Sequence, residues 1–302
     1  MGSNPVSERL RALLKVVGVF LALTGIWALY RLWSVNLIIH DGQIDWGMFF
    51  ITQILFQPLL GLLPILLIVR YVEKRRMQSI GLSKDKSVRN SFVGICLSLF
   101  ESVASICLTY ALFIPLGAGP LAFATNPENL DMAAILLMPV TFFLVVGLSE
   151  EVQDRGYFQT RLLEHFGPKF SIIFSSLLFA LSHLPIDILI WRYGVWMMAF
   201  HLGFVFIAGL IMGYLYYRSG VLTGPVFFHG LSDTLSSSYT LSFDYGGLSS
   251  GVVFGIMGLL YAVVTVIILL LIRFLSAKLD LKAANLPWET AITSSKPDQQ
   301  DR

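Results

Sequence analysis

The sequence predicts an all-α polytopic membrane protein with about eight transmembrane helices. Hydrophobic residues make up 56% of the 302 residues and charged residues only 13%, a composition that soluble domains of this length do not have. Apolar runs long enough to cross about 30 Å of hydrocarbon also recur along the chain. The predicted spans cover residues 11–32, 48–71, 90–117, 132–152, 170–186, 193–217, 221–241 and 251–275.

The distribution of basic residues predicts how these spans are oriented. With eight spans, all of the 21 Lys and Arg residues except Arg31 and Arg192 fall on one side of the membrane. Short cytoplasmic loops carry an excess of Lys and Arg, so both termini are expected in the cytoplasm and the protein in the cell membrane. No basic patch with interleaved aromatic residues indicates a nucleic-acid partner; the expected partners are membrane lipid and a membrane-associated peptide or protein.

The chain divides into four predicted regions. Residues 1–131 hold three N-terminal spans, and residues 132–240 form a core of the fourth to seventh helices. Residues 241–282 hold a C-terminal transmembrane helix. Residues 283–302 are polar and contain Pro and Gln, which predicts a disordered cytoplasmic tail.

Ionisable side chains inside the core spans mark the candidate site. A charge at bilayer depth costs roughly 2.5–3.5 kcal/mol on insertion scales, so such residues are by default functional. Their types suit hydrolysis, because carboxylates and imidazoles activate water and transfer protons. The candidates are Glu150, Glu151, Arg155, His183, His229 and Asp233.

Helical spacing pairs several of these residues. Glu151 and Arg155 are four residues apart, as are His229 and Asp233, so each pair shares one face of a helix. Glu150 lies about 100° round the helix from Glu151. One glutamate can therefore face a cavity while the other pairs with the arginine.

Depth along the helices brings the groups together. Gly167 is followed by Pro168, a turn signal between the fourth and fifth apolar runs. Glu150 lies 17 residues before Gly167 and His183 lies 16 after it. At about 1.5 Å per residue both are some 25 Å from the same turn. The groups are expected to meet in one cavity that opens toward the cytoplasm.

Three motifs resemble the signatures of the CPBP family. They are Glu150-Glu151-x-x-x-Arg155, Phe179-x-x-x-His183 and His229-x-x-x-Asp233, in order and on separate spans. The family comprises intramembrane proteases related to the type II CAAX prenyl endopeptidase and to bacteriocin-processing and self-immunity proteins. The resemblance covers about residues 132–240, while the remaining spans have only general membrane character.

The resemblance implies a mechanism and a role for each residue. Glu150 and His183 would activate a water molecule against a peptide carbonyl. His229 and Asp233 would stabilise the oxyanion, and Glu151 and Arg155 would shape the site. An ionised Asp233 only accepts hydrogen bonds, so it helps either in its protonated form or by keeping His229 cationic.

A zinc-dependent mechanism is an alternative at the same residues. Members of the family are often described as metalloproteases, and Glu150, His183 and His229 supply the two imidazoles and one carboxylate of a catalytic zinc site. The chain has no His-Glu-x-x-His helix, and the three residues come from separate spans. Glutamate-dependent hydrolysis without a cofactor is therefore favoured.

Other functions and residues stay open. A non-catalytic protein of the same fold, acting as an immunity factor or scaffold, is the main alternative to a protease. A transporter is disfavoured because no paired repeats are visible. Glu101 is expected to gate the site or pair with another helix, and His201 either lines the cavity or makes a packing hydrogen bond.

Overall fold

Seven helices of the structure are long and apolar enough to cross a membrane. The structure, a computed structural model, describes residues 5–117, 122–125, 132–242 and 247–289. Within these residues the ends of the seven spans lie within about six residues of the predicted ones, except that the fourth ends at Leu163 and was predicted to end at residue 152. They are Val6–Ile38, Trp46–Val72, Ser87–Phe113, Leu136–Leu163, Pro168–Leu189, Val195–Ser219 and Gly251–Lys278.

Several spans are built from consecutive helical segments. Segments labelled η have π-helical hydrogen bonds, except η3, which is a short 3-10 helix. In chain order the helices are α1 (Pro5–Ile38), α2 (Trp46–Gln57), η1 (Pro58–Leu62), α3 (Leu63–Leu67), η2 (Ile68–Val72), η3 (Met77–Ile80), α4 (Ser87–Phe113), α5 (Met132–Val140), η4 (Thr141–Gly147), α6 (Leu148–Glu151), η5 (Val152–Gln159), α7 (Thr160–Leu163), α8 (Pro168–Ser182), α9 (Leu184–Leu189), α10 (Val195–Ser219), α11 (Thr223–Ser238) and α12 (Ser250–Lys278).

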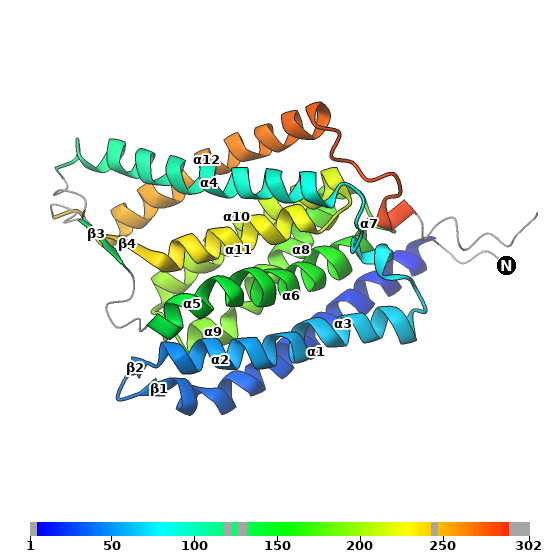
Figure 1. The fold of residues 1–302 in the computed structure, drawn as a ribbon, viewed down its shortest axis with the longest axis horizontal. Helices are drawn as coiled ribbons and strands as arrows, with labels where there is room; N and C mark the ends of the chain where they lie inside the picture. The colour runs from blue at the N-terminus through cyan, green and yellow to red at the C-terminus, as the bar shows by residue number, and fades with distance from the viewer. Residues whose placement is uncertain (1–4, 118–121, 126–131, 243–246, 290–302) are drawn as a thin grey trace, which may run out of the picture.

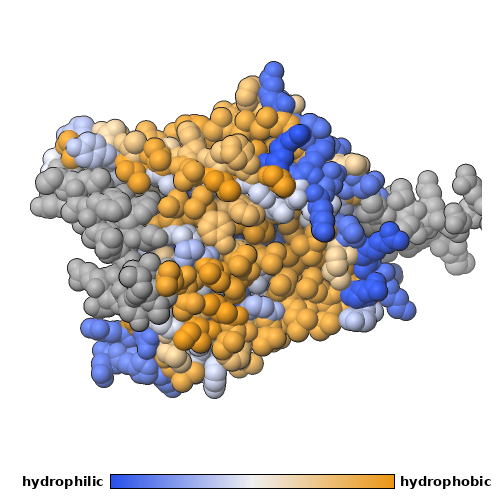
Figure 2. Space-filling view, in the orientation of Figure 1, coloured by the Kyte–Doolittle hydropathy of each residue, from blue (hydrophilic) through white to orange (hydrophobic). Residues whose placement is uncertain are grey.

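The helices form a bundle whose long axes run roughly together. In Figure 1, α4 and α12 lie along one edge, α1 to α3 lie along the opposite edge, and the helices of the predicted core lie between them. Figure 2 shows a broad apolar band between two hydrophilic ends on one face. Exposed apolar side chains in such a band suit contact with lipid. The predicted class, an all-α integral membrane protein, is confirmed.

The seventh predicted span corresponds to α11, which is shorter than the others. It has 16 residues, and many of them are Ser, Thr or another polar type, so it is not among the helices that are long and apolar enough to span a membrane. It packs closely along α4 and also contacts η4 and α10. The neighbouring helices therefore shield much of its polar surface from lipid.

Two short antiparallel strand pairs were not predicted. β1 (Ile39–His40) pairs with β2 (Gln43–Ile44) directly after α1. β3 (Ala122–Thr125) pairs with β4 (Tyr239–Ser242), joining the segment after α4 to the end of α11. Strands of this length carry too few residues to show an alternating pattern in the sequence.

The prediction of a disordered tail is wrong for its first residues. Leu286 and Trp288 are buried, and the Trp288 ring packs against the rings of Tyr216 and Tyr217. Two apolar side chains in a polar stretch were enough to dock this segment on α10. The rest of the predicted tail, residues 290–302, lies outside the described residues.

Close backbone contact between α4 and α11 depends on Gly94. A Cβ atom on Gly94 would lie 2.2 Å from the carbonyl oxygen of Gly224 and 3.1 Å from its carbonyl carbon. Because both obstacles are backbone atoms, Gly94→Ala is expected to lower the free energy of unfolding by about 1–3 kcal/mol. Gly25→Ala is the control, since a Cβ there meets nothing within 4 Å. Equal stability of both variants in detergent micelles would contradict this prediction.

An ion-pair cluster closes the end of the bundle where α1 begins. Glu73 accepts hydrogen bonds from Arg161 at 2.6 and 2.9 Å and from Lys15 at 2.5 Å. Its burial alone would raise the pKa of the carboxyl, but Arg161 and Lys15 outweigh this effect and lower the pKa below its ordinary value. The cluster therefore favours the ionised form of Glu73.

This cluster predicts a pH dependence of stability. A lowered pKa means that folding is stabilised above the ordinary pKa of Glu73 and that the stabilisation is lost as the pH falls through the ordinary and then the lowered value. The difference in unfolding free energy between wild type and Glu73→Gln should be largest near about pH 7 and should shrink toward about pH 3. A difference that grows as the pH falls would contradict the assignment.

Candidate active site

Glu151 and Arg155 form a buried ion pair at the centre of the fourth span. Nη1 of Arg155 donates to Oε1 of Glu151 at 2.9 Å, and both side chains are almost fully buried. The predicted spacing of four residues thus produces the expected contact. The α-helical turn that carries the two glutamates lies between the π-helical segments η4 and η5, and such segments often occur at functional sites.

Neighbouring helices hold the arginine in place. Its guanidinium lies 4.3 Å from the ring centroid of Phe179 on α8, and Nη2 donates to the carbonyl oxygen of Gly209 on α10 at 3.2 Å. Gly209 allows α10 to pack closely on α8, because a Cβ there would lie 2.9 Å from Cβ of Ser176. Arg155 therefore ties three helices together beside the second signature motif.

His229 lies among three carboxylates. Its Nδ1 donates to Oε1 of Glu151 at 2.9 Å. Its Nε2 lies 3.3 Å from Oδ2 of Asp233 and 3.8 Å from Oε2 of Glu150. The first and third signature motifs thus meet at one imidazole, as the depth of the residues predicted.

The hydrogen bonds of His183 determine its tautomer. His183 comes directly after the last residue of α8. Its Nδ1 lies 2.9 Å from the carbonyl oxygen of Phe179. A carbonyl oxygen only accepts, so Nδ1 carries a hydrogen and the neutral ring has a free lone pair on Nε2. The ring of His183 also interacts electrostatically with the carboxylate of Glu150.

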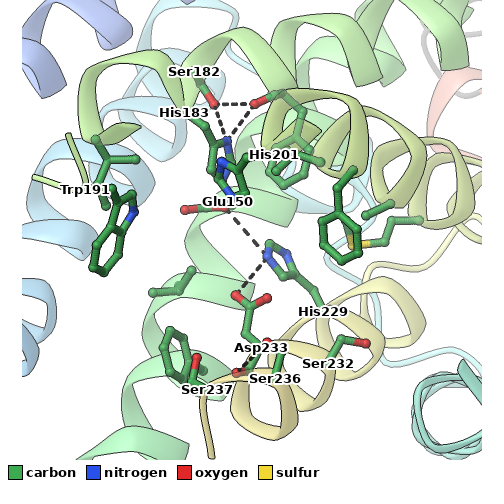
Figure 3. A pocket seen from close by; sticks show the side chains of 18 of the residues that line it. Glu150, Ser182, His183, Trp191, His201, His229, Ser232, Asp233, Ser236 and Ser237 are labelled. Atoms are coloured by element: carbon green, nitrogen blue, oxygen red, sulfur yellow. Dashed lines mark hydrogen bonds and ion pairs between the residues drawn. The ribbon is translucent and has the colours of Figure 1, made fainter. Parts of the chain in front are cut away.

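Glu150 keeps one carboxylate oxygen free. Oε1 accepts a hydrogen bond from Nε2 of Gln57 on α2 at 3.1 Å, whereas Oε2 is buried and has no hydrogen-bond partner among the described residues. Figure 3 shows Glu150, His183, His229 and Asp233 gathered around one space. The two glutamates thus divide as expected: Glu151 pairs with the arginine, and Glu150 faces the cavity.

These side chains line a cavity of about 660 Å³. Its other walls come from the last third of α1, from α2, from the C-terminal half of α4, from residues 191–212 and from the N-terminal half of α12. These parts lie at the end of the bundle where α1 ends, away from the charged loop of residues 73–89 (Figure 1). All six predicted site residues lie at or next to this cavity.

The lining residues show in which half of the bundle most of the cavity lies. A position some 25 Å from the Gly167 turn is already beyond the middle of a hydrocarbon layer about 30 Å thick. The space around Glu150 and His183 accordingly extends toward the opposite end of the helices. The depth argument was correct about which groups meet, and the side from which they are reached stays a prediction.

His201 and Glu101, whose roles the sequence left undecided, belong to hydrogen-bond networks that line the same cavity. His201 lies 3.0 Å from Oδ2 of the buried Asp187, and its ring is 5.9 Å from that of His183. Glu101 accepts hydrogen bonds from Ser232 at 2.9 Å and from Tyr261 at 2.7 Å. Glu101 thus connects α4 with α11 and α12, which is the helix pairing that its position predicted.

Other cavity residues gave no signal in the sequence. Gln57 supports Glu150, and Gln53 accepts a hydrogen bond from Arg31 at 3.1 Å. Both glutamines lie in α2, outside the region of the resemblance, and a glutamine near a helix end is not unusual. Their spacing of four residues was the available clue, because it places them on one face.

The zinc alternative was tested against the arrangement of these side chains. Within the described residues, no group of three or more His, Cys, Asp and Glu side chains is placed to hold a metal ion. Nδ1 of His183 and Nδ1 of His229 are hydrogen-bonded to protein oxygens, which leaves Nε2 of each ring as the nitrogen that could bind a water or a metal ion. Glutamate-dependent hydrolysis without a metal therefore stays a prediction, and no step below involves a metal ion.

The fold and the cavity define a class: an integral membrane protein with carboxylates and imidazoles converging inside the helix bundle. Residues 132–235 match the sequence model of the family described as Type II CAAX prenyl endopeptidase Rce1-like. This match over about a third of the chain agrees with the predicted resemblance to the CPBP intramembrane proteases, and it indicates a protease. Neither the curated proteins nor the solved structures gave a match to the chain.

Proposed function

We propose that this protein is an intramembrane endopeptidase that hydrolyses a peptide bond of a membrane-associated protein or peptide with a water activated by Glu150 and His183. The observation that carries the proposal is the free, buried Oε2 of Glu150 in a cavity that two imidazoles also line. A polar atom without a partner in such a place is suited to hold a water molecule.

Water activation follows from the hydrogen-bonding capacity of the two groups. Before the reaction, the water donates one hydrogen bond to Oε2 of Glu150 and another to Nε2 of His183. The water oxygen then attacks the carbonyl carbon of the peptide as its proton passes to Glu150. Gln57 holds the second carboxylate oxygen and so fixes the direction of the first.

The opposite side of the site supports the tetrahedral intermediate. The carboxylates around His229 favour its imidazolium form, in which Nε2 carries a hydrogen. This hydrogen can donate to the oxyanion, and a donor placed in this way in a dry site contributes about 3–4 kcal/mol. Asp233 then acts by stabilising the cation, so an acidic residue at this position is compatible with catalysis.

Product formation returns the proton. Glu150, protonated in the first step, transfers its proton to the nitrogen of the leaving amine, and the C–N bond breaks. The intermediate collapses to an amine and a carboxylic acid, which keeps the second proton of the water and later loses it to solvent. Glu150 is then ionised for the next cycle. Glu151 and Arg155 do not contact the reacting atoms; they hold His229 and position the α8 and α10 helices around it.

The substrate is expected to be membrane-associated, because the site lies within the spanning helices. With both termini in the cytoplasm of the cell, as the basic residues predict, the cavity lies in the half of the bundle away from the cytoplasm. A prenylated substrate is one option that the family description suggests. The cavity walls carry enough aromatic and aliphatic residues to accept either a lipid chain or an apolar peptide.

The experiment that tests this function compares membrane fractions from cells with wild-type protein, Glu150→Ala and His183→Ala by quantitative proteomics. At least one membrane-associated peptide or protein should accumulate uncleaved in both variants, with the variants present at wild-type levels. Identical peptide profiles in all three strains would remove the protease proposal. A wild-type phenotype of the Glu150→Ala strain would instead favour a non-catalytic immunity or scaffold role. Processing that survives metal chelation would support the cofactor-free mechanism.

A further inference from the structure

Arg31 is a buried cation in the catalytic cavity that forms no ion pair with an acid of the described chain. The residue lies in α1, is 5% exposed and lines the cavity. Its Nη2 donates to Gln53, whereas Nη1 is buried without a hydrogen-bond partner. Arg155 and Arg161 are similarly buried, but each has a carboxylate within 4.0 Å, and Arg31 has none among the described residues.

Burying this charge without a contacting counter-ion is costly. Removing an ion from water costs several kilocalories per mole unless a counter-ion and hydrogen bonds replace the hydration. The rings of Trp27 and Tyr30, 5.3 and 5.2 Å from the guanidinium carbon, offset part of this cost, and Glu150 attracts the cation without touching it. None of these groups provides an acceptor for Nη1, so the guanidinium retains the capacity to bind an anion.

Two glutamines on α2 place the anion-binding guanidinium of Arg31 near the catalytic group proposed above, Glu150. Gln53 and Gln57 are one helical turn apart on the same face; the first holds Arg31 and the second holds Glu150. Side chains with this spacing have Cβ atoms about 5–6 Å apart. An anion bound at Arg31 therefore lies within a few residues of extended peptide from the bond that Glu150 would attack.

We propose that Arg31 binds a carboxylate group of the peptide substrate and so sets which bond is presented to Glu150. This inference rests on the proposed function, because it assumes that a peptide occupies the cavity. A carboxylate suits the site, since the planar guanidinium binds it in a fixed geometry and a buried, charge-assisted hydrogen bond is strong. The carboxylate comes either from the C-terminus of the substrate or from an Asp or Glu side chain.

The test measures binding, with full-length protein in nanodiscs of phosphatidylcholine. The probes are three pools of N-acetylated apolar tripeptides: one with a free C-terminal carboxylate, the same pool as C-terminal amides, and an amide pool with Asp at the middle position. Mass spectrometry quantifies the peptides retained by wild type, Arg31→Gln, Arg31→Lys and Arg192→Gln. Arg192 is exposed and serves as the control.

Wild type and Arg192→Gln should retain the carboxylate pool at least about tenfold better than the plain amides. Arg31→Gln should reduce this ratio to about one, and Arg31→Lys should preserve part of it because the charge remains. Arg31-dependent retention of the Asp-containing amides would assign the site to an acidic side chain; retention of free carboxylates alone would assign it to the C-terminus.

Equal retention of the carboxylate and amide pools by wild type would overturn the proposal. So would an unchanged ratio in Arg31→Gln. A third overturning result is Arg31-dependent thermal stabilisation by phosphatidylglycerol without peptide discrimination, since the anion would then be a lipid. If discrimination fails while Glu150→Ala cells still accumulate an uncleaved protein, only the carboxylate site is wrong. Discrimination without such accumulation would instead contradict the hydrolysis.

Discussion

Replacing Glu150 with Gln is expected to lower the rate of substrate cleavage by about 10²–10⁴-fold while the fold is retained. The amide has the size of the carboxylate and its carbonyl still accepts the hydrogen bond from Gln57, so the local structure is preserved. It has no basic oxygen to take a proton from water, so the chemical step is lost and the binding of the peptide is not.

The measurement uses membranes from Glu150→Ala cells as the source of uncleaved substrate. Purified wild-type protein, Glu150→Gln or Glu289→Gln is added in liposomes, and mass spectrometry follows the product with time. Glu289 is an exposed glutamate far along the chain from the site, so its variant should match the wild-type rate. Cleavage by Glu150→Gln at the wild-type rate would show that another group activates the water.

The largest effect on stability is expected from Arg155→Ala, which should lower the free energy of unfolding by about 3–5 kcal/mol. The substitution removes the partner of the buried Glu151 carboxylate and the stacking on Phe179, and leaves the carbonyl of Gly209 without its donor. His229 still donates to Glu151, but one hydrogen bond does not replace the guanidinium.

Unfolding in mixed detergent micelles measures this cost against Arg192→Ala, an exposed arginine whose loss should change stability by less than about 0.5 kcal/mol. Arg155→Lys separates charge from geometry: it should lie between wild type and Arg155→Ala, because an ammonium keeps the charge and loses the planar contacts. A loss below about 1 kcal/mol for Arg155→Ala would mean that water reaches Glu151 in the folded protein.

The two glutamates illustrate how far local sequence rules reach. The spacing of Glu151 and Arg155 predicted their ion pair, and the 100° turn between neighbouring residues predicted that Glu150 faces elsewhere. Both rules depend only on helix geometry. The identity of the residue that donates a hydrogen bond to Glu150, Gln57, depends on how the second span packs beside α6, and no local pattern contains that information.

His201 and the tail show the same limit. The sequence left His201 between a packing role and a cavity role, and the structure gives it both, because Asp187 binds the ring at the cavity wall. The prediction of disorder used the average composition of residues 283–302, in which Leu286 and Trp288 are outnumbered by polar residues. Their burial against α10 comes from the shape of that helix, which composition does not describe.

By itself the sequence determined the membrane class, the approximate ends of most spans and the six ionisable residues of the candidate site, because hydrophobic length and helical periodicity act within single segments. Only the tertiary structure decided that the cavity extends away from the charged loops, that Arg31 is buried there with no ion-pair partner among the described residues, and that Gln53 and Gln57 connect it to Glu150. These features depend on how each helix is rotated about its axis and on which helices it packs against. Many weak contacts between distant segments determine both.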